Sequence, residues 1–384
     1  MTVWIQNPFD NLPCEGFRKQ RFWLMAEAFA AQGHDVVLWT SDFSHANKAP
    51  RRFLEDPGIA AAGFTLRLIP TPPYSGNVGL ARVRSHAAYA RRWFCRAREE
   101  GARRRPDVIV TSSPTLSAAL AALKLGSLFG AKVVVDVMDA WPETFERLAP
   151  KGLRWLSRLC MLPFRILAHR LYRRADLVTG VCERYRALTG RDDYCLAYHG
   201  VELPPSGPAA VRPETTARAV RLAYVGNTGR TYDLATVFRA VAANPDWTLD
   251  IAGEWKGPVP DRVRIHGYLD EPSLRQLLAA CDVGVIPMRP DSWVGVPYKL
   301  CDYARAGLRI VSSLGGESSA LLASYRCGET YEPGNPASLA EAVRRALTLE
   351  RAAARRLCER AFDARDIYAS YVARVCRLQR PLHA

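Results

Sequence analysis

Short runs of β-branched residues alternate with longer helical patterns along the chain, and no other feature limits the fold as strongly. Before Gly33, for example, Phe22, Met25 and Phe29 recur at helical spacing. Strands separated by helices pair in parallel, with helices on both faces of the sheet. In the first half the strand candidates are TVWIQ (2–6), DVVLWT (35–40), TLRLIP (65–70), DVIVTS (107–112), KVVVDV (132–137) and DLVTGV (176–181).

A second set of strands follows a linker rich in Pro and small residues at 201–220. The 384 residues also exceed what one hydrophobic core usually supports. We therefore expect two doubly wound, Rossmann-like α/β domains in residues 1–200 and 201–365, facing a central cleft. Residues 366–384 are expected to form a helix that packs back on the first domain. The second set of candidates is VRLAYVG (220–226), TLDIAG (248–253), RVRIHG (262–267), DVGVIP (282–287) and RIVSS (309–313).

The chain is strongly basic, and its charge is unevenly distributed. The net charge is +15, from 53 Lys and Arg against 38 Asp and Glu. Residues 1–200 hold 29 basic and 18 acidic side chains, a difference of +11, whereas residues 201–384 hold 24 and 20, a difference of +4. A basic surface attracts nucleic acid, anionic lipid or a phosphorylated substrate, and composition alone does not choose among them.

The ten cysteines are scattered, without a CxxC pair or a Cys/His cluster. This distribution argues against a disulfide framework and a zinc site, so we expect no metal and no bound cofactor. The N-terminal MTVWIQNPFD lacks the cationic and apolar segments of a secretory signal, and no apolar run approaches the ~18 residues of a spanning helix. We therefore expect a cytoplasmic protein.

Glycines follow several strand candidates of the second half. They are Gly226, Gly253 and Gly267, and then the pair Gly315 and Gly316. Glycine at a strand end lets the backbone approach a ligand, and the N–H groups exposed there bind anions. Each one alone is also compatible with a plain turn. Their clustering in one domain predicts a site for a phosphorylated nucleotide.

The stretch GVPYKLCDYARAG (295–307) supports the same interpretation. A helix that begins near Pro297 presents its positive N-terminal end, with Lys299 beside it and Asp302 three residues later. A cation suits a diphosphate, and a carboxylate suits the two vicinal hydroxyls of a ribose. An ordinary surface pair at this spacing is the alternative.

With these segments in view, the chain resembles the family 4 retaining glycosyltransferases, which have the GT-B fold. The second half carries the resemblance in AYVGNTGRTYDL, LDIAGE, RIHGYLDEPSLRQLLAACDVGVIPM and VPYKLCDYARAGLRIVSSLGGE. In the first half, VTSSPTLSAALAALKL followed by KVVVDVMDAWPET is similar to segments of the polysaccharide-assembly members, and RADLVTGVCERY and YHGVEL match in place. The resemblance covers nearly the whole chain and implies a hexosyltransferase-type enzyme that works without a metal.

Carried over by position, the resemblance implies that Asp302 is the second acid of the family's EX7E signature and holds the ribose. The first acid of that signature is absent, because Val294 stands there. Asn227 and Asp233 occupy the places where the family often has Arg and Lys for the phosphates.

Arg230 and Lys299 are therefore the remaining cationic candidates of the second half. Asp139 lies near the position of the family's catalytic histidine, with a turn or cap aspartate as the alternative. We expect Asp139, Lys299 and Arg230 to act in catalysis. The residues expected to bind the nucleotide sugar, of UDP or GDP type, are Gly16, Gly226, Asn227, Gly253, Gly267, Tyr268, Lys299, Asp302, Gly315, Gly316 and Glu317.

Residues 151–174 combine charge with apolar side chains. They hold seven Lys and Arg and no acid, with Trp155, Leu159 and Phe164 among apolar residues at roughly helical spacing. A basic amphipathic segment of this kind lies on an anionic bilayer, and a core helix with a solvated cationic face is the alternative. The membrane interpretation places the protein peripherally at the inner face of the cell membrane.

Together these features predict a retaining glycosyltransferase that moves a sugar to a saccharide acceptor, polyprenyl-linked, in the assembly of cell-surface polysaccharide or glycolipid. A soluble small-molecule acceptor is the near alternative. A non-catalytic basic protein that binds membrane or nucleic acid is another, but the ordered glycines oppose it, and we expect no nucleic-acid partner. A sugar-nucleotide epimerase would need acids and histidines in the cleft that the pattern does not supply.

Overall fold

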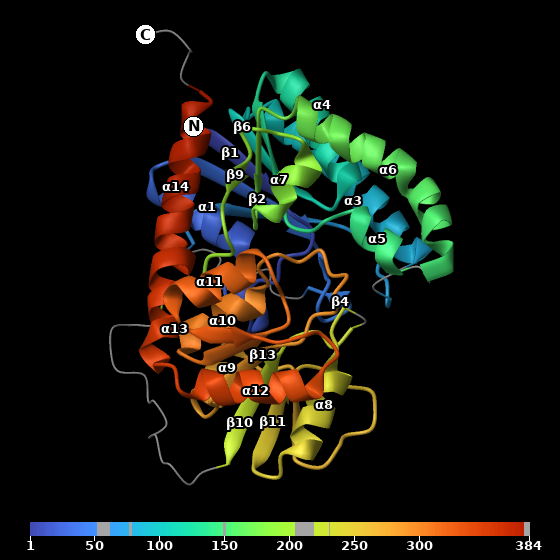
Figure 1. The fold of residues 1–384 in the computed structure, drawn as a ribbon. Helices are drawn as coiled ribbons and strands as arrows, with labels where there is room; N and C mark the ends of the chain where they lie inside the picture. The colour runs from blue at the N-terminus through green and yellow to red at the C-terminus, as the bar shows by residue number, and fades with distance from the viewer. Residues whose placement is uncertain (52–61, 77–78, 149–150, 204–218, 230, 380–384) are drawn as a thin grey trace. The chain divides into compact units, whose positions relative to one another are not determined.

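A computed structural model describes residues 1–51, 62–76, 79–148, 151–203, 219–229 and 231–379. The linker expected at 201–220 therefore lies largely outside the described residues. The two doubly wound parallel sheets expected from the sequence are both present, and every strand candidate lies on a strand (Figure 1).

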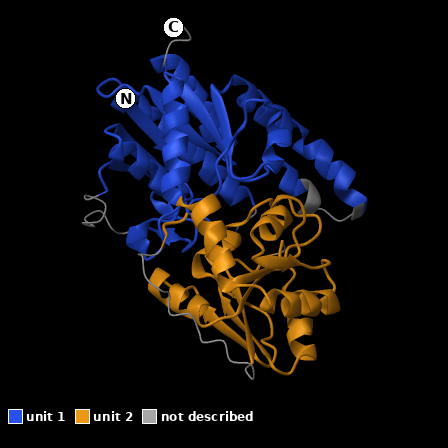
Figure 2. Ribbon diagram, turned by 60° about the vertical axis from the view of Figure 1, so that its left-hand side comes forward, with its two compact units in different colours: residues 1–200, 364–384 blue, residues 201–363 orange. Residues whose placement is uncertain are grey.

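The chain divides into two compact units (Figure 2). Unit 1 comprises residues 1–200 together with residues 364–384, and unit 2 comprises residues 201–363. The chain thus leaves unit 1 after its first sheet and returns to it with the last helix.

Unit 1 is built on a seven-stranded parallel sheet in the order β5-β2-β1-β6-β7-β8-β9. Its strands are β1 (Thr2–Gln6), β2 (Asp35–Ser41), β5 (Thr65–Ile69), β6 (Val108–Ser113), β7 (Lys132–Val137), β8 (Leu177–Gly180) and β9 (Cys195–Leu196). A two-stranded antiparallel hairpin, β3 (Phe43–Ser44) and β4 (Ala49–Pro50), follows β2. The α-helices are α1 (Arg21–Ala31), α3 (Leu80–Gly101), α4 (Leu116–Phe129), α5 (Glu143–Leu148), α6 (Arg154–Arg174), α7 (Arg184–Thr189) and α14 (Ala364–Arg377).

Unit 2 has a six-stranded parallel sheet in the order β12-β11-β10-β13-β14-β15. Its strands are β10 (Val220–Val225), β11 (Trp247–Ala252), β12 (Val263–Gly267), β13 (Val283–Ile286), β14 (Arg309–Ser312) and β15 (Gly328–Thr330). The helices are α8 (Leu234–Ala243), α9 (Glu271–Ala279), α10 (Tyr298–Ala306), α11 (Glu317–Tyr325), α12 (Pro336–Leu347), α13 (Arg351–Leu357) and the π-helical turn η3 (Cys358–Phe362).

The core of unit 1 lies between the sheet and its helices. Phe22, Met25 and Phe29, the helical stripe expected from the sequence, are fully buried. Strand runs such as Lys132–Val137 are buried along almost their whole length, as in a parallel sheet covered on both faces. Helix α14 completes this core, since Tyr371 packs edge-on against Phe29 with ring centres 6.4 Å apart.

Both sheets reverse their winding direction at one point, and this decides where a ligand can bind. In unit 1 the reversal lies between β1 and β6, and in unit 2 between β10 and β13. The connecting helices leave these neighbouring strands toward opposite faces, so a crevice opens beyond their carboxyl ends. Any site of this architecture is expected at these two edges.

Candidate functional site

In unit 2, a tyrosine separates the two strands at the reversal point. The Tyr303 hydroxyl, from α10, accepts a hydrogen bond from the Val225 N–H at 3.0 Å and lies 3.2 Å from the carbonyl oxygens of Ala223 and Val285. Gly284 makes room for the ring, because a Cβ there would lie 2.4 Å from it. Tyr303 therefore takes over the hydrogen bonding where pairing of β10 with β13 stops, and it fixes α10 against the strand ends.

Lys299, one turn earlier on α10, lies directly at the end of β10. Its side chain is only 6% exposed, and its Nζ lies 4.0 Å from the ring centre of Tyr232 and 4.9 Å from that of Tyr224. A Cβ on Gly226 would lie 3.2 Å from this Nζ. Within the described part of the chain, no carboxylate forms an ion pair with it. The ammonium is held by aromatic faces and is available to an anion.

The glycines after β10, β11 and β12 converge at the same edge. A Cβ on Gly253 would lie 2.2 Å from the carbonyl oxygen of Gly226, so only glycine fits. Gly253 also forms a bridge with Gly267, and the Gly226 N–H donates to the Ala252 carbonyl at 2.7 Å. Three of the predicted glycines are therefore brought together beside Lys299.

The segment after β14 joins this edge through its serine. The Ser313 hydroxyl donates to the carbonyl oxygens of Ile286 at 3.2 Å and Met288 at 2.7 Å, which ties the end of β14 to the end of β13. Gly316, with φ of 64°, then turns the chain into α11, and Glu317 is the first residue of that helix. The N-terminal end of α11 accordingly lies at the same edge of the sheet, with Gly315 exposed before it.

The structure places the remaining predicted residues after β10 and β12 in different surroundings. The Asn227 side chain accepts a hydrogen bond from the Gly229 N–H at 2.7 Å, so it shapes the loop itself. Tyr224 donates its hydroxyl to the Asn227 carbonyl. Arg230 lies outside the described residues. Tyr268, directly after β12, is 63% exposed.

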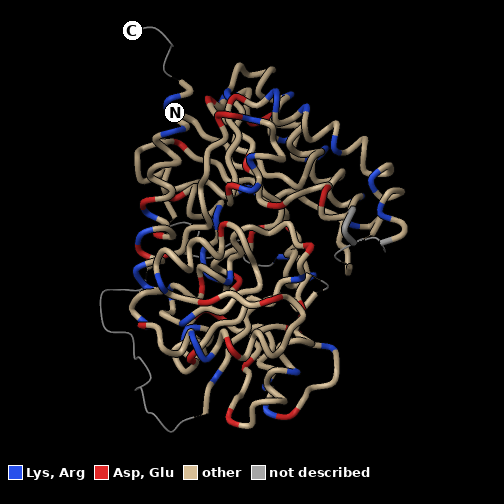
Figure 3. The backbone as a smooth tube through the Cα atoms, in the orientation of Figure 1, with Lys and Arg blue, Asp and Glu red and all other residues tan. Residues whose placement is uncertain are grey.

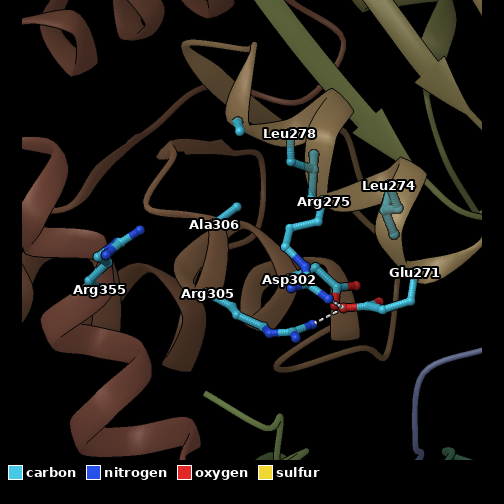
Figure 4. A pocket seen from close by; sticks show the side chains of 9 residues that line it. Glu271, Leu274, Arg275, Leu278, Asp302, Arg305, Ala306 and Arg355 are labelled. Atoms are coloured by element: carbon cyan, nitrogen blue, oxygen red, sulfur yellow. Dashed lines mark hydrogen bonds and ion pairs between the residues drawn. The ribbon is translucent and has the colours of Figure 1, made fainter. Parts of the chain in front are cut away.

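Asp302 has different neighbours from Lys299. It lines a small pocket between α9 and α10 together with Glu271, Arg275 and Arg305, and Glu271 accepts a hydrogen bond from Arg305 (Figure 4). Although three helical positions place the two side chains only about 60° apart around the axis, Asp302 lines the pocket beside α9 and Lys299 lies at the end of β10. The spacing suggested shared surroundings, and the structure gives the two side chains different ones. The contact of Asp302 with a ribose stays a prediction.

In unit 1, the predicted residues lie after β1 and β7. Gly16, with φ of 81°, ends the 3-10 helix η1 (Pro13–Glu15), and it is exposed. Asp139 follows β7 and is half-buried. Burial raises the pKa of its carboxyl above the ordinary value, while the Ala140 N–H and the Arg82 guanidinium oppose this rise.

Sequence reasoning missed a polar cluster beside Asp139. The Tyr74 hydroxyl lies 2.6 Å from His45 Nδ1, the Lys48 ammonium lies 3.2 Å from the same nitrogen, and Arg82 donates to His86 Nε2 at 3.3 Å. Burial and neighbouring cations lower the pKa of His45 to about 3 and that of His86 to about 4, so both rings are neutral at pH 7. These residues come from three separate segments, and no local motif connects them.

Helix α6 agrees only in part with the core-helix interpretation of residues 151–174, and its contact with a membrane stays a prediction. Its apolar side chains are exposed over the first four turns, including Trp155 at 66% and Leu159 at 60%, whereas Ala168, Leu171 and Tyr172 near its end are buried. The core-helix interpretation thus holds only for the last turns. In the described part of the chain, no helix is sufficiently long and apolar to cross a bilayer, and no cluster of His, Cys, Asp and Glu has the makings of a metal site.

Two family models match the chain in succession. Residues 19–195 match the model described as a Glycosyl transferase 4-like domain, and residues 219–348 match Glycosyl transferases group 1. A search of curated proteins found no match.

Solved structures share the fold over almost the whole chain. Sucrose-phosphate synthase from Thermosynechococcus elongatus aligns with a TM-score of 0.71 at 15% identity, over 98% of each chain. HepE from Anabaena, in complex with UDP and glucose, aligns with a TM-score of 0.65 at 13% identity, over 98% of this chain and 99% of its own. A glycosyltransferase from Rickettsia africae gives a TM-score of 0.62 at 12% identity, over 98% of both chains. From its two matched domains and from this shared fold, the chain belongs to the family 4-type glycosyltransferases with the GT-B fold.

Proposed function

We propose that the protein transfers a hexose from a nucleoside-diphosphate sugar, with retention of anomeric configuration, to a lipid-linked saccharide. The assembly of cell-surface polysaccharide or glycolipid is the process in which we place it. One observation carries the donor half of this proposal: the buried Lys299 ammonium lies beside Gly226 at the end of β10, where unit 2 reverses its winding.

The chemistry of the leaving group explains why this edge suits such a donor. As the bond between the anomeric carbon and the diphosphate breaks, negative charge develops on the departing phosphate oxygen. The N-terminal ends of α10 and α11 and the Lys299 ammonium all act on such charge without rearranging. The complex of HepE with UDP and glucose, a protein of the same fold, supports a UDP sugar as the first donor to test.

The acceptor hydroxyl attacks the anomeric carbon, and its proton passes to the departing phosphate oxygen. The products are a glycoside and a nucleoside diphosphate, and atoms and charge balance without a metal or a protein-bound intermediate. Asp139 is proposed to lie on the acceptor side, where its raised pKa suits hydrogen bonding to a sugar hydroxyl. Asp302 is proposed to hold the ribose.

The exposed face of α6 supports the lipid-linked acceptor. Arginines recur along this helix (Figure 3), and all six of them accompany the exposed Trp155 and Leu159. Cationic side chains bind anionic headgroups and apolar ones enter the acyl boundary, so α6 is proposed to hold the protein peripherally at the inner face of the cell membrane.

Two measurements test this proposal. Thermal shift against UDP, GDP and other nucleoside diphosphates should identify the base, because a ligand at 100 times its dissociation constant adds about 2.7 kcal/mol of stability. Labelled donor should then transfer sugar to acceptor membranes. Transfer to soluble acceptors alone would replace the lipid-linked acceptor by a soluble one, and the absence of both binding and transfer would refute the enzyme.

A further inference from the structure

Unit 1 contains a large apolar pocket that neither the donor site nor the exposed face of α6 accounts for. Its volume is about 440 Å³, and α3, α4 and α6 supply most of its wall together with Trp141 and Phe145. Pockets that bind small molecules have volumes of ~300–1,000 Å³. The lining is almost entirely apolar, with Leu116, Leu120 and Leu167 on the inside, so a polar ligand would lose its hydrogen bonds there.

The mouth of this pocket is apolar as well. Leu80, Val83 and Phe164 line it and are at the same time 82%, 54% and 42% exposed. Apolar side chains exposed together mark a surface that binds lipid or protein. Since Phe164 belongs to α6, the mouth continues into the exposed face that begins at Trp155.

One wall of the pocket carries positive charge. The lining includes the Arg82 guanidinium and the His86 imidazole. Lys48 lies close enough to Arg82 for the two positive charges to interact. Burial lowers the pKa of Arg82, and the Tyr74 hydroxyl and the Asp139 carboxyl oppose this decrease. Guanidinium groups in such surroundings bind phosphate.

The pocket also ends where unit 1 is expected to bind its substrate. Pro114 directly follows β6, and Trp141 follows Asp139 after the end of β7. A ligand that fills the pocket therefore places its polar end at the carboxyl edge of the sheet, beside Asp139.

We propose that this pocket binds the hydrocarbon chain of the acceptor's lipid carrier, with its phosphate at Arg82 and the attached saccharide beside Asp139. This inference rests on the proposed function and deepens it. The face of α6 binds the bilayer as a surface, whereas the pocket takes one lipid chain out of it and so orients the acceptor.

A fluorescent polyprenyl phosphate in detergent micelles tests the pocket in the full-length protein. Ala87 lines the pocket and is exposed, so Ala87→Trp fills it without disturbing the core. We expect its dissociation constant for the probe to rise by about tenfold or more, equivalent to about 1.4 kcal/mol. Cys95→Trp, at an exposed position of α3 outside the pocket, is the matched control and should bind as the wild type does.

Arg82→Gln distinguishes the contribution of the phosphate to binding from that of the hydrocarbon chain. It should weaken binding of the polyprenyl phosphate and leave that of the corresponding polyprenol unchanged, whereas Ala87→Trp should weaken both. Equal binding by Ala87→Trp and the wild type, or full displacement of the probe by inorganic phosphate, would overturn the inference.

The same proteins distinguish a failure of this inference from a failure of the proposed function. Ala87→Trp should keep the thermal shift with nucleoside diphosphate and its sedimentation with anionic vesicles, since neither uses the pocket. If the wild type binds nucleotide and transfers sugar, and Ala87→Trp leaves the affinity for the lipid probe unchanged, only the proposed lipid pocket is refuted. A wild-type protein without nucleotide binding refutes the enzyme, whatever the lipid titration shows.

Discussion

Replacement of Lys299 by Met is the sharpest test of the donor site. Methionine keeps an unbranched apolar stem of similar length and removes the charge. In the wild type, Lys299 is 6% exposed, and its ammonium lies 4.0 Å from the Tyr232 ring centre without an ion-paired carboxylate among the described residues. Its loss of hydration is therefore compensated by aromatic faces alone until an anion binds.

The substitution has two opposing effects on the free energy of unfolding. Losing a desolvated cation–π contact costs about 2 kcal/mol, but the variant no longer has to bury a charge. The two effects largely cancel, so the stability should change by less than about 1 kcal/mol. Losing a charge-assisted bond to the diphosphate costs about 1.5–3 kcal/mol, a factor of roughly 10–150 in nucleotide affinity.

Isothermal titration calorimetry with the nucleoside diphosphate measures the affinity, and urea unfolding measures the stability. Lys256→Met is the matched control, because the Lys256 side chain is 82% exposed and forms an exposed ion pair with Glu254. Unchanged nucleotide affinity in Lys299→Met would refute the assignment of this ammonium to the diphosphate. A large loss of stability with unaltered affinity would make Lys299 a structural residue.

Three further predictions concern the described contacts. Gly253→Ala should lower nucleotide affinity and cost about 1–3 kcal/mol in urea unfolding, because its Cβ would lie 2.2 Å from the Gly226 carbonyl oxygen and push the strand ends apart. Arg21→Met should destabilise the protein by about 3–5 kcal/mol, since it leaves the fully buried Asp136 carboxylate without the cation that it binds at 2.8 Å. Burial raises the pKa of Asp10 to about 7, so the folded protein binds a proton there that the unfolded chain has lost. The stability that this proton provides is present in full below about pH 4 and is lost as the pH rises to about 7. In Asp10→Asn, the free energy of unfolding measured with urea should lose this dependence on pH between about pH 4 and pH 7. An identical pH profile in the variant and the wild type would contradict the prediction.

Much of the sheet architecture was predictable because buried parallel strands are local apolar runs. The segment KVVVDV, for instance, is rich in β-branched valine and is buried along almost its whole length. The short strands β9 and β15 and the hairpin of β3 and β4 were missed. Two or three residues carry no periodicity, and their pairing depends on the neighbours that the fold brings to them.

The candidate site likewise has features that the sequence predicted and features that it did not. The convergence of Gly226 and Gly253 was predictable because both follow strands that the sequence already marks. The aromatic contacts of Lys299 with Tyr224 and Tyr232 were not found, and neither was the turn of Asp302 toward α9.

The sequence by itself determined the order of the elements, the parallel sheets and the glycines at the strand ends, because each of these depends on residues adjacent along the chain. The tertiary structure alone decided the insertion of Tyr303 between β10 and β13, the packing of α14 on α1, and the grouping of Arg82 and His86 with Trp141 around one pocket. These contacts join residues far apart in sequence, and their free energy exists only once the chain has closed the loops between them.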